Sequence, residues 1–468
     1  MSSIADRLQQ TERGQISILP PMQGRSRDAL PAETVRGGVY LAARYGLGVI
    51  VSLANMLVMT RWIGPHAYGV FVTAIGIVAF LATLARGGID TYLVRSESTP
   101  SQSTYGTAVT LILGGSVGLG LLAVVTMPLL IRWYGNRQFA APYLALLLTI
   151  PVTGLTGIPM AKLERALDFR NIAGIELGGQ AAGLLVAALV AWSRPSVWAP
   201  VAGQISWQLF TLVATLACGS LTLRPRFCAV EARKMLAYGL VLTASVRTWQ
   251  LRSLVNPLLV GRFAGAEAVA FVALAIRISE ALGSFRLAAG RIAIAALARM
   301  QERREDFCVA LEHALYLQII TLGPLLCAFA LLGPVVLPRV AGARWGPSLA
   351  VYPFVAAGVL INSIYNLQAS ALFVVGKQWI VMRCYAAHVG LLAAITVILL
   401  PRVGLTGYGW AELASCSAYL GIHASIAKLI PISYRQLTPW VTTLLASLFL
   451  FSLWPVILNL ARNWRFTR

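Results

Sequence analysis

The sequence predicts an all-α protein that crosses a membrane many times. Hydrophobic residues make up 58% of its 468 residues and charged residues only 12%, whereas about a quarter of an ordinary soluble domain is charged. The mean hydropathy is +0.73, and apolar segments recur along the whole length. A soluble fold would leave much of this surface facing water, so a soluble globular protein and a protein with one membrane anchor are both excluded.

The first predicted element is a cytoplasmic tail over residues 1–37. It is polar, and Pro20 and Pro21 would interrupt any helix within it. No apolar stretch of signal-peptide length precedes residue 38. We therefore expect a tail that is disordered or lies on the membrane surface.

Thirteen apolar segments follow, each long enough to cross a bilayer, which takes about 20 helical residues. They should all be helices, because lipid offers no hydrogen-bond partner to an unpaired backbone group. The expected count is thirteen spans, within a range of 12 to 14. The segments are 38–60, 67–86, 105–131, 139–160, 171–192, 197–221, 235–260, 267–289, 309–338, 347–373, 380–400, 404–428 and 437–460.

Basic residues in the connections predict the orientation. With the N-terminus inside, the N-terminal tail and the inner connections together hold 22 Lys and Arg residues, and the outer connections hold eight. Cytoplasmic loops carry this excess in membrane proteins, so the N-terminus is predicted to be cytoplasmic. Thirteen spans then place Arg462, Arg465 and Arg468 outside, against the same rule, and an even number of spans would remove that conflict.

Signals for several other classes of function are absent. The six cysteines form no CxxC pair and the four histidines are scattered, so we expect neither a disulfide framework nor a metal site. No GxxxxGK[ST] motif is present, which excludes ATP hydrolysis by a phosphate loop. The net charge of +21 would suit nucleic acid in a soluble protein, but cationic cytoplasmic loops explain it here. We expect no cofactor and no nucleic-acid partner.

An internal repeat relates the two halves of the chain. Residues 52–82 and 253–283 align without a gap, and 11 of the 31 positions are identical. Matches among apolar letters alone could arise by chance, but Asn, Arg and Gly also match. The polar and glycine matches are Asn55 with Asn256, Arg61 with Arg262, and Gly64 with Gly265.

Six predicted spans separate the two copies, so the copies have the same orientation in the membrane. The sequence therefore predicts two parallel six-helix lobes around a central cavity, an architecture of transporters. The expected N-lobe is 38–221, the cytoplasmic linker is 222–234, and the C-lobe is 235–428. Residues 429–468 form an extra C-terminal helix and a basic tail.

Four segments carry a resemblance to a known family. TRWIGPHAYGVF with LVRS after the next helix resembles the first hairpin of the polysaccharide-transporter family, the flippase branch of the multidrug/oligosaccharidyl-lipid/polysaccharide exporter superfamily. AKLERALDFRNIAGIEL resembles its fourth-to-fifth-helix loop, and VGRFAGAEAVAFVALAIRISEALGSF resembles its seventh and eighth helices. ARWGPSLAVYPFVAAGVLINSIYNLQASALFVVGKQW resembles its tenth helix and the loop that follows. The similarity spans residues 35–430.

The resemblance implies two lobes, alternating access and export of lipid-linked saccharide units across the bacterial plasma membrane. Two positions depart from the family pattern. Asn256 stands where members often carry an acid, which weakens any ion-coupling role there, and IAIAALARM lacks a proline frequent at the end of the eighth helix.

Candidate substrate-binding residues are polar groups deep in the predicted spans, where a charge costs about 2.5–3.5 kcal/mol. Guanidinium groups pair with phosphate through two hydrogen bonds, which suits an anionic diphosphate. Simpler explanations are an inner-leaflet phosphate contact for Arg44, an ion pair with Glu280 for Arg277, and an interhelical hydrogen bond for Asn256. The candidates are Arg44, Arg247, Arg252, Arg277 and Asn256.

Three deep carboxylates are candidates for ion coupling: Glu176, Glu280 and Glu412. The deep arginines outnumber these acids, which favours an anionic substrate over a cationic drug. Aromatic residues near span ends are expected to be interfacial anchors. Examples are Trp62, Trp133, Trp198, Trp345 and Trp379.

The predicted function is a flippase for an undecaprenyl-diphosphate-type lipid-linked oligosaccharide in the bacterial inner membrane, with no covalent catalysis. It would serve assembly of O-antigen, capsule or exopolysaccharide, with membrane lipids, a polysaccharide polymerase and assembly machinery as partners. The alternatives are a peptidoglycan-precursor flippase or a cation-coupled multidrug antiporter of the same superfamily. A membrane polymerase or ligase is a rival of another class, but the predicted outer loops are short and lack clustered His or acidic residues.

Overall fold

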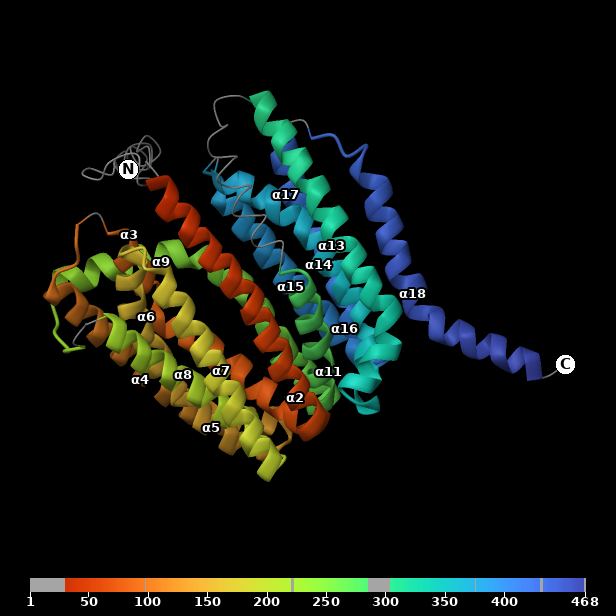
Figure 1. The fold of residues 1–468 in the computed structure, drawn as a ribbon, viewed down its shortest axis with the longest axis horizontal. Helices are drawn as coiled ribbons and strands as arrows, with labels where there is room; N and C mark the ends of the chain where they lie inside the picture. The colour runs from red at the N-terminus through yellow and green to blue at the C-terminus, as the bar shows by residue number, and fades with distance from the viewer. Residues whose placement is uncertain are drawn as a thin grey trace, which may run out of the picture.

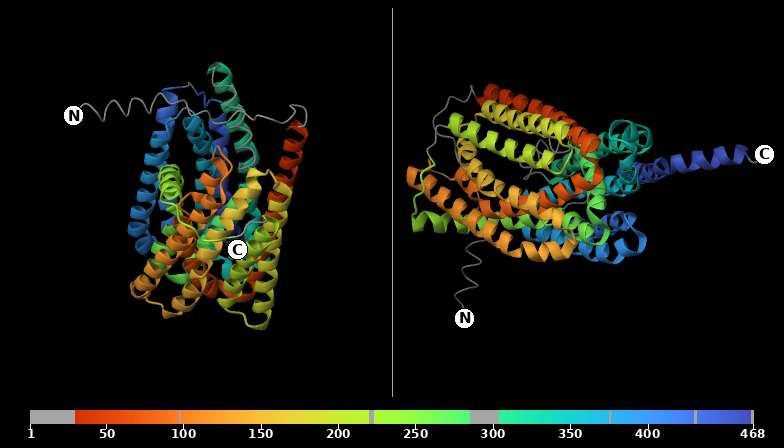
Figure 2. Two further views of the ribbon diagram at one scale, coloured as in Figure 1. Left: turned by 90° about the vertical axis from the view of Figure 1, so that its left-hand side faces the viewer. Right: turned by 90° about the horizontal axis from the view of Figure 1, so that it is seen from below.

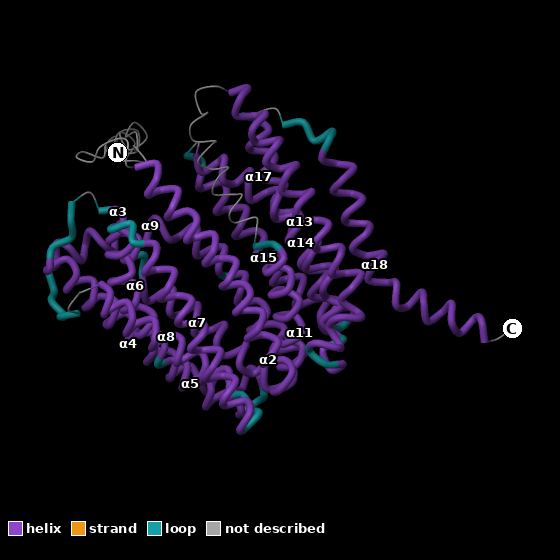
Figure 3. The backbone as a smooth tube through the Cα atoms, viewed as in Figure 1, coloured by secondary structure: helices purple, strands orange, loops and turns teal. Residues whose placement is uncertain are grey.

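The computed structural model describes residues 30–96, 98–219, 223–284, 304–374, 376–429 and 432–466. Every regular element in these ranges is a helix, as Figure 3 shows. This confirms the predicted helical class. The first 29 residues of the predicted tail, the segment 292–300 and Arg468 lie outside the described residues.

The N-terminal half comprises the elements α2 to α8, drawn from red to yellow-green in Figure 1. Short connections join its long helices, and the turn η1 (Arg137–Phe139) precedes α5. The helices are α2 (Leu30–Arg86), α3 (Ile89–Arg95), α4 (Gln102–Tyr134), α5 (Ala140–Leu147), α6 (Thr149–Arg165), α7 (Phe169–Ser193) and α8 (Trp198–Gly219).

The C-terminal half comprises α9 to α17 and lies beside the first half, followed by α18 (Figure 1). Its helices are α9 (Ala229–Gln250), α10 (Arg252–Val255), α11 (Gly261–Leu282), α13 (Arg304–Val340), α14 (Pro347–Val374), α15 (Gln378–Val403), α16 (Thr406–Ser415), α17 (Leu420–Ala427) and α18 (Leu437–Phe466). Short π-helical and 3₁₀-helical turns connect several of them: η2 (Asn256–Val260), η3 (Ala343–Trp345) and η4 (Cys416–Tyr419).

Nine helices in the described part of the chain are long and apolar enough to cross a membrane. This confirms a multi-span protein, whereas the count of thirteen and the cytoplasmic N-terminus stay predictions. Two of the nine contain a break: Gly64 interrupts α2 and Gly265 interrupts α11. Both breaks fall between segments that the sequence predicts to be separate spans.

The break at Gly265 folds the chain back on itself. The Asn256 side chain donates a hydrogen bond to the Val269 carbonyl at 3.2 Å, although 13 residues of straight helix would separate them by roughly 20 Å. Asn256 also begins the π-helical turn η2, and Pro257 cannot donate the backbone hydrogen bond of a regular helix. We call the end of the bundle that carries Gly64 and Gly265 the hairpin end.

The two halves pack closely along α2 and α11. A Cβ atom added to Gly69 would lie 1.8 Å from the carbonyl oxygen of Ala266, so only glycine permits this approach. Ala74 and Ala275, which match in the repeat, are both fully buried. The duplicated segments therefore form the central contact between the halves.

Helices α7 and α8 pack through glycines as well. A Cβ at Gly183 would lie 2.9 Å from the carbonyl oxygen of Gly203. Small residues bring membrane helices together in this way, since lipid tails are as apolar as leucine and burial alone gives little driving force. At the other end of the chain, α18 packs on α13 and then extends away from the body (Figures 1 and 2).

Candidate functional site

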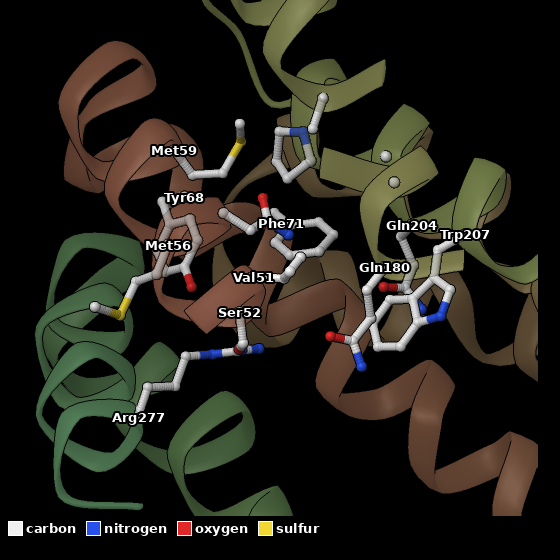
Figure 4. Close-up of a pocket in the computed structure, with 15 residues that line it drawn as sticks. Val51, Ser52, Met56, Met59, Tyr68, Phe71, Gln180, Gln204, Trp207 and Arg277 are labelled. Atoms are coloured by element: carbon white, nitrogen blue, oxygen red, sulfur yellow. The ribbon is translucent and has the colours of Figure 1, made fainter. Parts of the chain in front are cut away.

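A cavity of about 230 Å³ lies where the halves meet, and we call it the inter-half cavity. Helices α2, α7 and α8 line it, and one described residue, Arg277 of α11, enters from the other half. Figure 4 shows Arg277 reaching toward Ser52, with Gln180 and Trp207 on the far wall. Arg277 is exposed, so its guanidinium group is available to a ligand in this space.

A second cavity of about 520 Å³, the N-half cavity, is lined by α2, α3, α6, α7 and α8. Gln180 and Trp207 line both cavities, so the two spaces adjoin. At the end of α2 away from the hairpin end, Arg86 pairs with Asp90 at 3.7 Å in the wall of the N-half cavity. Glu164 and Glu176 line the same cavity.

Two glycines of α7 fix the position of the Trp207 indole. A Cβ at Gly179 would lie 2.7 Å from Cδ1 of the ring, and one at Gly183 would lie 3.0 Å from the Trp207 Cβ. The ring therefore lies flush against α7, because neither glycine has a side chain to displace it. The α7–α8 packing thus places an aromatic ring in the wall shared by both cavities.

Two amides of the inter-half cavity have unsatisfied oxygens. The Gln180 Oε1 and Asn55 Oδ1 atoms are buried, and neither has a hydrogen-bond partner within the described part of the chain. A buried acceptor without a partner costs about 1–3 kcal/mol. These oxygens are therefore groups that a bound molecule or water would satisfy.

Reciprocal indole hydrogen bonds join the halves at the hairpin end. The Nε1 of Trp133 on α4 donates to the Leu258 carbonyl at 2.9 Å, and the Nε1 of Trp345 donates to the Thr60 carbonyl at 2.9 Å. Trp345 also packs edge-on against Tyr68, with ring centroids 5.7 Å apart. Tyr68 lines the inter-half cavity, so this aromatic layer separates the cavity from the hairpin end.

Trp345 corrects the expectation that it is an interfacial anchor. It is 1% exposed and buried between the halves, whereas Trp62, Trp133, Trp198 and Trp379 are at least 39% exposed. Its position after a glycine-rich turn resembled a span end, and the sequence does not reveal that the other half covers it.

A buried ion pair lies within the C-terminal half. Arg252 of α10 donates a hydrogen bond to Glu412 of α16, and their side chains are 18% and 2% exposed. The Arg252 guanidinium lies 5.4 Å from the Trp249 ring centre. His388, fully buried beside them, contacts the Ser415 carbonyl at 3.0 Å through Nδ1 and stacks on Tyr419.

The structure brings only some of the predicted site residues together. Arg277 lines the inter-half cavity, Glu176 lines the N-half cavity, and Arg252 pairs with Glu412. Asn256 is buried and donates a hydrogen bond to the Val269 carbonyl, which is a structural role.

Other predicted residues lie apart from this group. Glu280 is exposed on α11, and the two described side chains of Arg277 and Glu280 form no ion pair within 4 Å. The backbones of Arg44 and Arg247 lie in α2 and α9, but their side chains are outside the described residues.

Sequence reasoning missed Trp207, Gln180 and His388. The amides of α7 and α8 do form a sequence signal, because Gln180, Gln204 and Gln208 are polar residues deep in predicted spans. Neutral polar residues cost less in lipid than charges, so they are a weaker sequence signal for a functional site.

The family described as "polysaccharide biosynthesis protein" matches residues 58–350. The lipopolysaccharide biosynthesis protein WzxC of Escherichia coli (strain K12) is 23% identical over 422 residues, covering 87% of this chain and 84% of WzxC. This similarity extends over most of both chains.

Two solved structures resemble the whole fold. The lipid II flippase MurJ, in an inward closed conformation, has a TM-score of 0.73 at 12% identity and covers 89% of this chain and 92% of its own. An inward-facing multidrug resistance MATE family transporter of the MOP superfamily has a TM-score of 0.64 at 15% identity, covering 81% and 94%. At these identities the likeness concerns the fold alone.

These findings confirm the predicted fold, which the chain shares with the lipid II flippase and the MATE transporter. The family match and the nine apolar helices of the described chain support a multi-pass protein of the bacterial inner membrane. The two solved structures are a flippase and a transporter, not a polymerase or a ligase. The match over residues 58–350 covers more than half of the sequence. The chain therefore belongs to the polysaccharide biosynthesis protein family.

Proposed function

We propose that this protein translocates a polyprenyl-diphosphate-linked oligosaccharide across the plasma membrane for assembly of a surface polysaccharide. Membership of the polysaccharide biosynthesis family supports this substrate class, as does similarity to a lipopolysaccharide biosynthesis protein. The observation that carries the proposal is Arg277, an exposed arginine that enters the inter-half cavity from α11. O-antigen, capsule and exopolysaccharide precursors all share this head-group chemistry.

Arg277 suits a diphosphate because its guanidinium can donate two parallel hydrogen bonds to phosphate oxygens. Its position deep in a predicted span would be costly without such a partner. Arg44 and Arg247 are proposed as further cationic contacts on the path. Arg252 and Asn256 are weaker candidates, because one pairs with Glu412 and the other with the Val269 carbonyl.

We propose that transport proceeds by alternating access, with residues 38–221 and 235–428 as the two moving lobes. The indole hydrogen bonds of Trp133 and Trp345 cross between the halves at the hairpin end. Opening toward that side would break both bonds. The polar head group would cross through the cavities while the lipid tail stays in the membrane.

Glu176, Glu280 and Glu412 remain proposals for ion coupling. Glu176 lines the N-half cavity and Glu280 is exposed on α11, so both carboxylates can meet water or an ion. Glu412 is nearly fully buried and pairs with Arg252, so in this conformation its carboxylate is already engaged.

Flipping by the purified protein in liposomes tests the function. Wild type should move a fluorescent polyprenyl-diphosphate oligosaccharide between leaflets, and Arg277→Ala should slow this at least tenfold. Arg277→Lys should recover part of the rate, because it restores the charge but not the planar fork. Arg194→Ala, which removes an exposed arginine of a predicted outer loop, is the matched control. Normal flipping by Arg277→Ala would remove the main support for the proposal.

Lipid II translocation is the second candidate, favoured by the fold similarity to the lipid II flippase. The same liposomes loaded with lipid II, or with a fluorescent cationic drug, compare the three substrates directly. Faster transport of either alternative than of the oligosaccharide lipid would replace our proposal. A polysaccharide polymerase and other assembly proteins are proposed partners, to be sought by cross-linking in cells.

A further inference from the structure

The wall shared by the two cavities is neutral and rich in amides. Gln180 and Trp207 line both cavities, Asn55 and Gln204 line the inter-half cavity, and Gln208 lines the N-half cavity. An amide offers donors and acceptors without charge. An indole offers a flat apolar face with negative character, which attracts C–H groups.

Few charged groups line this region. In the inter-half cavity the charged group among the described lining residues is Arg277. The N-half cavity holds the Arg86–Asp90 pair, Glu164 and Glu176, and Glu176 lies one helical turn before Gln180 on α7. An inorganic ion would be expected to bind at those charged groups, whereas the amides and the indole suit an uncharged molecule rich in hydroxyl groups.

The unsatisfied amide oxygens point to a donor-rich ligand. Gln180 Oε1 and Asn55 Oδ1 are buried acceptors without partners in the described part of the chain. They come from different helices, α7 and α2, and line one cavity. Hydroxyl groups of a sugar are donors that would satisfy both, while a pyranose ring presents its C–H face to an aromatic ring.

We infer that Trp207, Gln180, Gln204 and Asn55 form a saccharide subsite that holds a neutral pyranose ring of the substrate, next to a diphosphate at Arg277. This deepens the proposed function and rests on it. The indole stacks on the sugar ring, the amides bind its hydroxyl groups, and the N-half cavity receives further sugar units. Its volume of about 520 Å³ lies within the usual range for small-molecule sites, about 300–1,000 Å³.

Binding measurements separate the saccharide subsite from the phosphate contact. The full chain in lipid nanodiscs is titrated with undecaprenyl diphosphate and with undecaprenyl diphosphate that carries one hexose. Wild type should bind the hexose lipid about tenfold more tightly. Trp207→Ala should lose that difference and leave the affinity for the bare diphosphate unchanged, whereas Trp207→Phe, which keeps a ring, should retain most of it. Arg277→Ala should weaken both lipids.

A second variant and a control guard against misfolding. Gln180→Leu keeps the size of the side chain but removes the amide, and should reduce only hexose-lipid binding, by about threefold to tenfold. Trp198→Ala removes an exposed indole from α8, the helix that carries Trp207. This control should change neither affinity.

Four results would overturn the inference. Equal binding of both lipids by wild type, or an unchanged preference in both Trp207→Ala and Gln180→Leu, would remove the saccharide subsite while sparing the proposed function. Equal weakening of both lipids by both variants would assign these residues to structure or to the lipid. Failure of wild type to bind either lipid would reject the proposed function itself.

Discussion

Gly64 and Gly265 have the same backbone conformation, with φ of 75° and 82° and ψ of 171° and 178°. They match in the internal repeat, and both interrupt a long helix. This region of φ and ψ is essentially restricted to glycine. The duplication therefore extends to backbone geometry, which chance matching of apolar residues would not produce.

The first prediction concerns these glycines. Gly64→Ala or Gly265→Ala should lower the free energy of unfolding by about 1–3 kcal/mol, because alanine is strained in this conformation. Thermal unfolding in detergent measures the effect. Gly174→Ala is the control: this helical glycine has open space around it, so alanine there should be neutral or stabilising. Equal melting of all three variants would contradict the prediction.

The second prediction concerns the indole bonds between the halves. Trp133→Phe with Trp345→Phe removes both N–H donors, which is worth about 1 kcal/mol for each hydrogen bond. Without these bonds, the inter-half cavity should open more often toward the hairpin end. A cysteine at Ser52, in a chain without its six native cysteines, should react faster with a membrane-impermeant thiol reagent added outside. Trp192→Phe, on the exposed face of α7, should not change that rate.

The third prediction concerns the buried ion pair. Glu412→Gln leaves the Arg252 charge buried without its partner and should cost about 3–5 kcal/mol of stability. Replacing both, as Arg252→Met with Glu412→Leu, should recover most of that loss. Lys234→Met breaks an ion pair whose lysine is 58% exposed and should change stability by less than about 1 kcal/mol. A double variant as unstable as Glu412→Gln would refute the pairing.

The fourth prediction is the orientation in the membrane. A cysteine at Ser98 should react with an impermeant reagent only from the cytoplasm, and one at Asn136 only from outside. Both positions lie in connections between helices of the described chain, and the excess of basic residues assigns them to opposite sides. Labelling of Ser98 from outside would reverse the orientation.

The sequence was sufficient to predict the helical class, the family and the position of both helix breaks. Long apolar runs indicate the helical class, the four motif segments carry the resemblance to the family, and the gapless repeat contains both breaks. The pairing of Arg252 with Glu412 was not predictable, because 160 residues separate them and hydropathy gives depth in the membrane without the rotation of each helix. The position of Trp207 in the cavity wall was not predictable either. The α7 glycines fix its ring only once α7 and α8 have packed together.

The inter-half cavity takes one wall from each half, because Arg277 belongs to α11 whereas its other described lining residues belong to α2, α7 and α8. A molecule that contacts both walls gains its full contact energy only while the halves remain at this separation. By linkage, it must favour this arrangement over more open ones by its difference in affinity between them. Substrate binding and the separation of the two halves are thus thermodynamically coupled. A truncated substrate that contacts only one wall would bind without shifting the population of conformations.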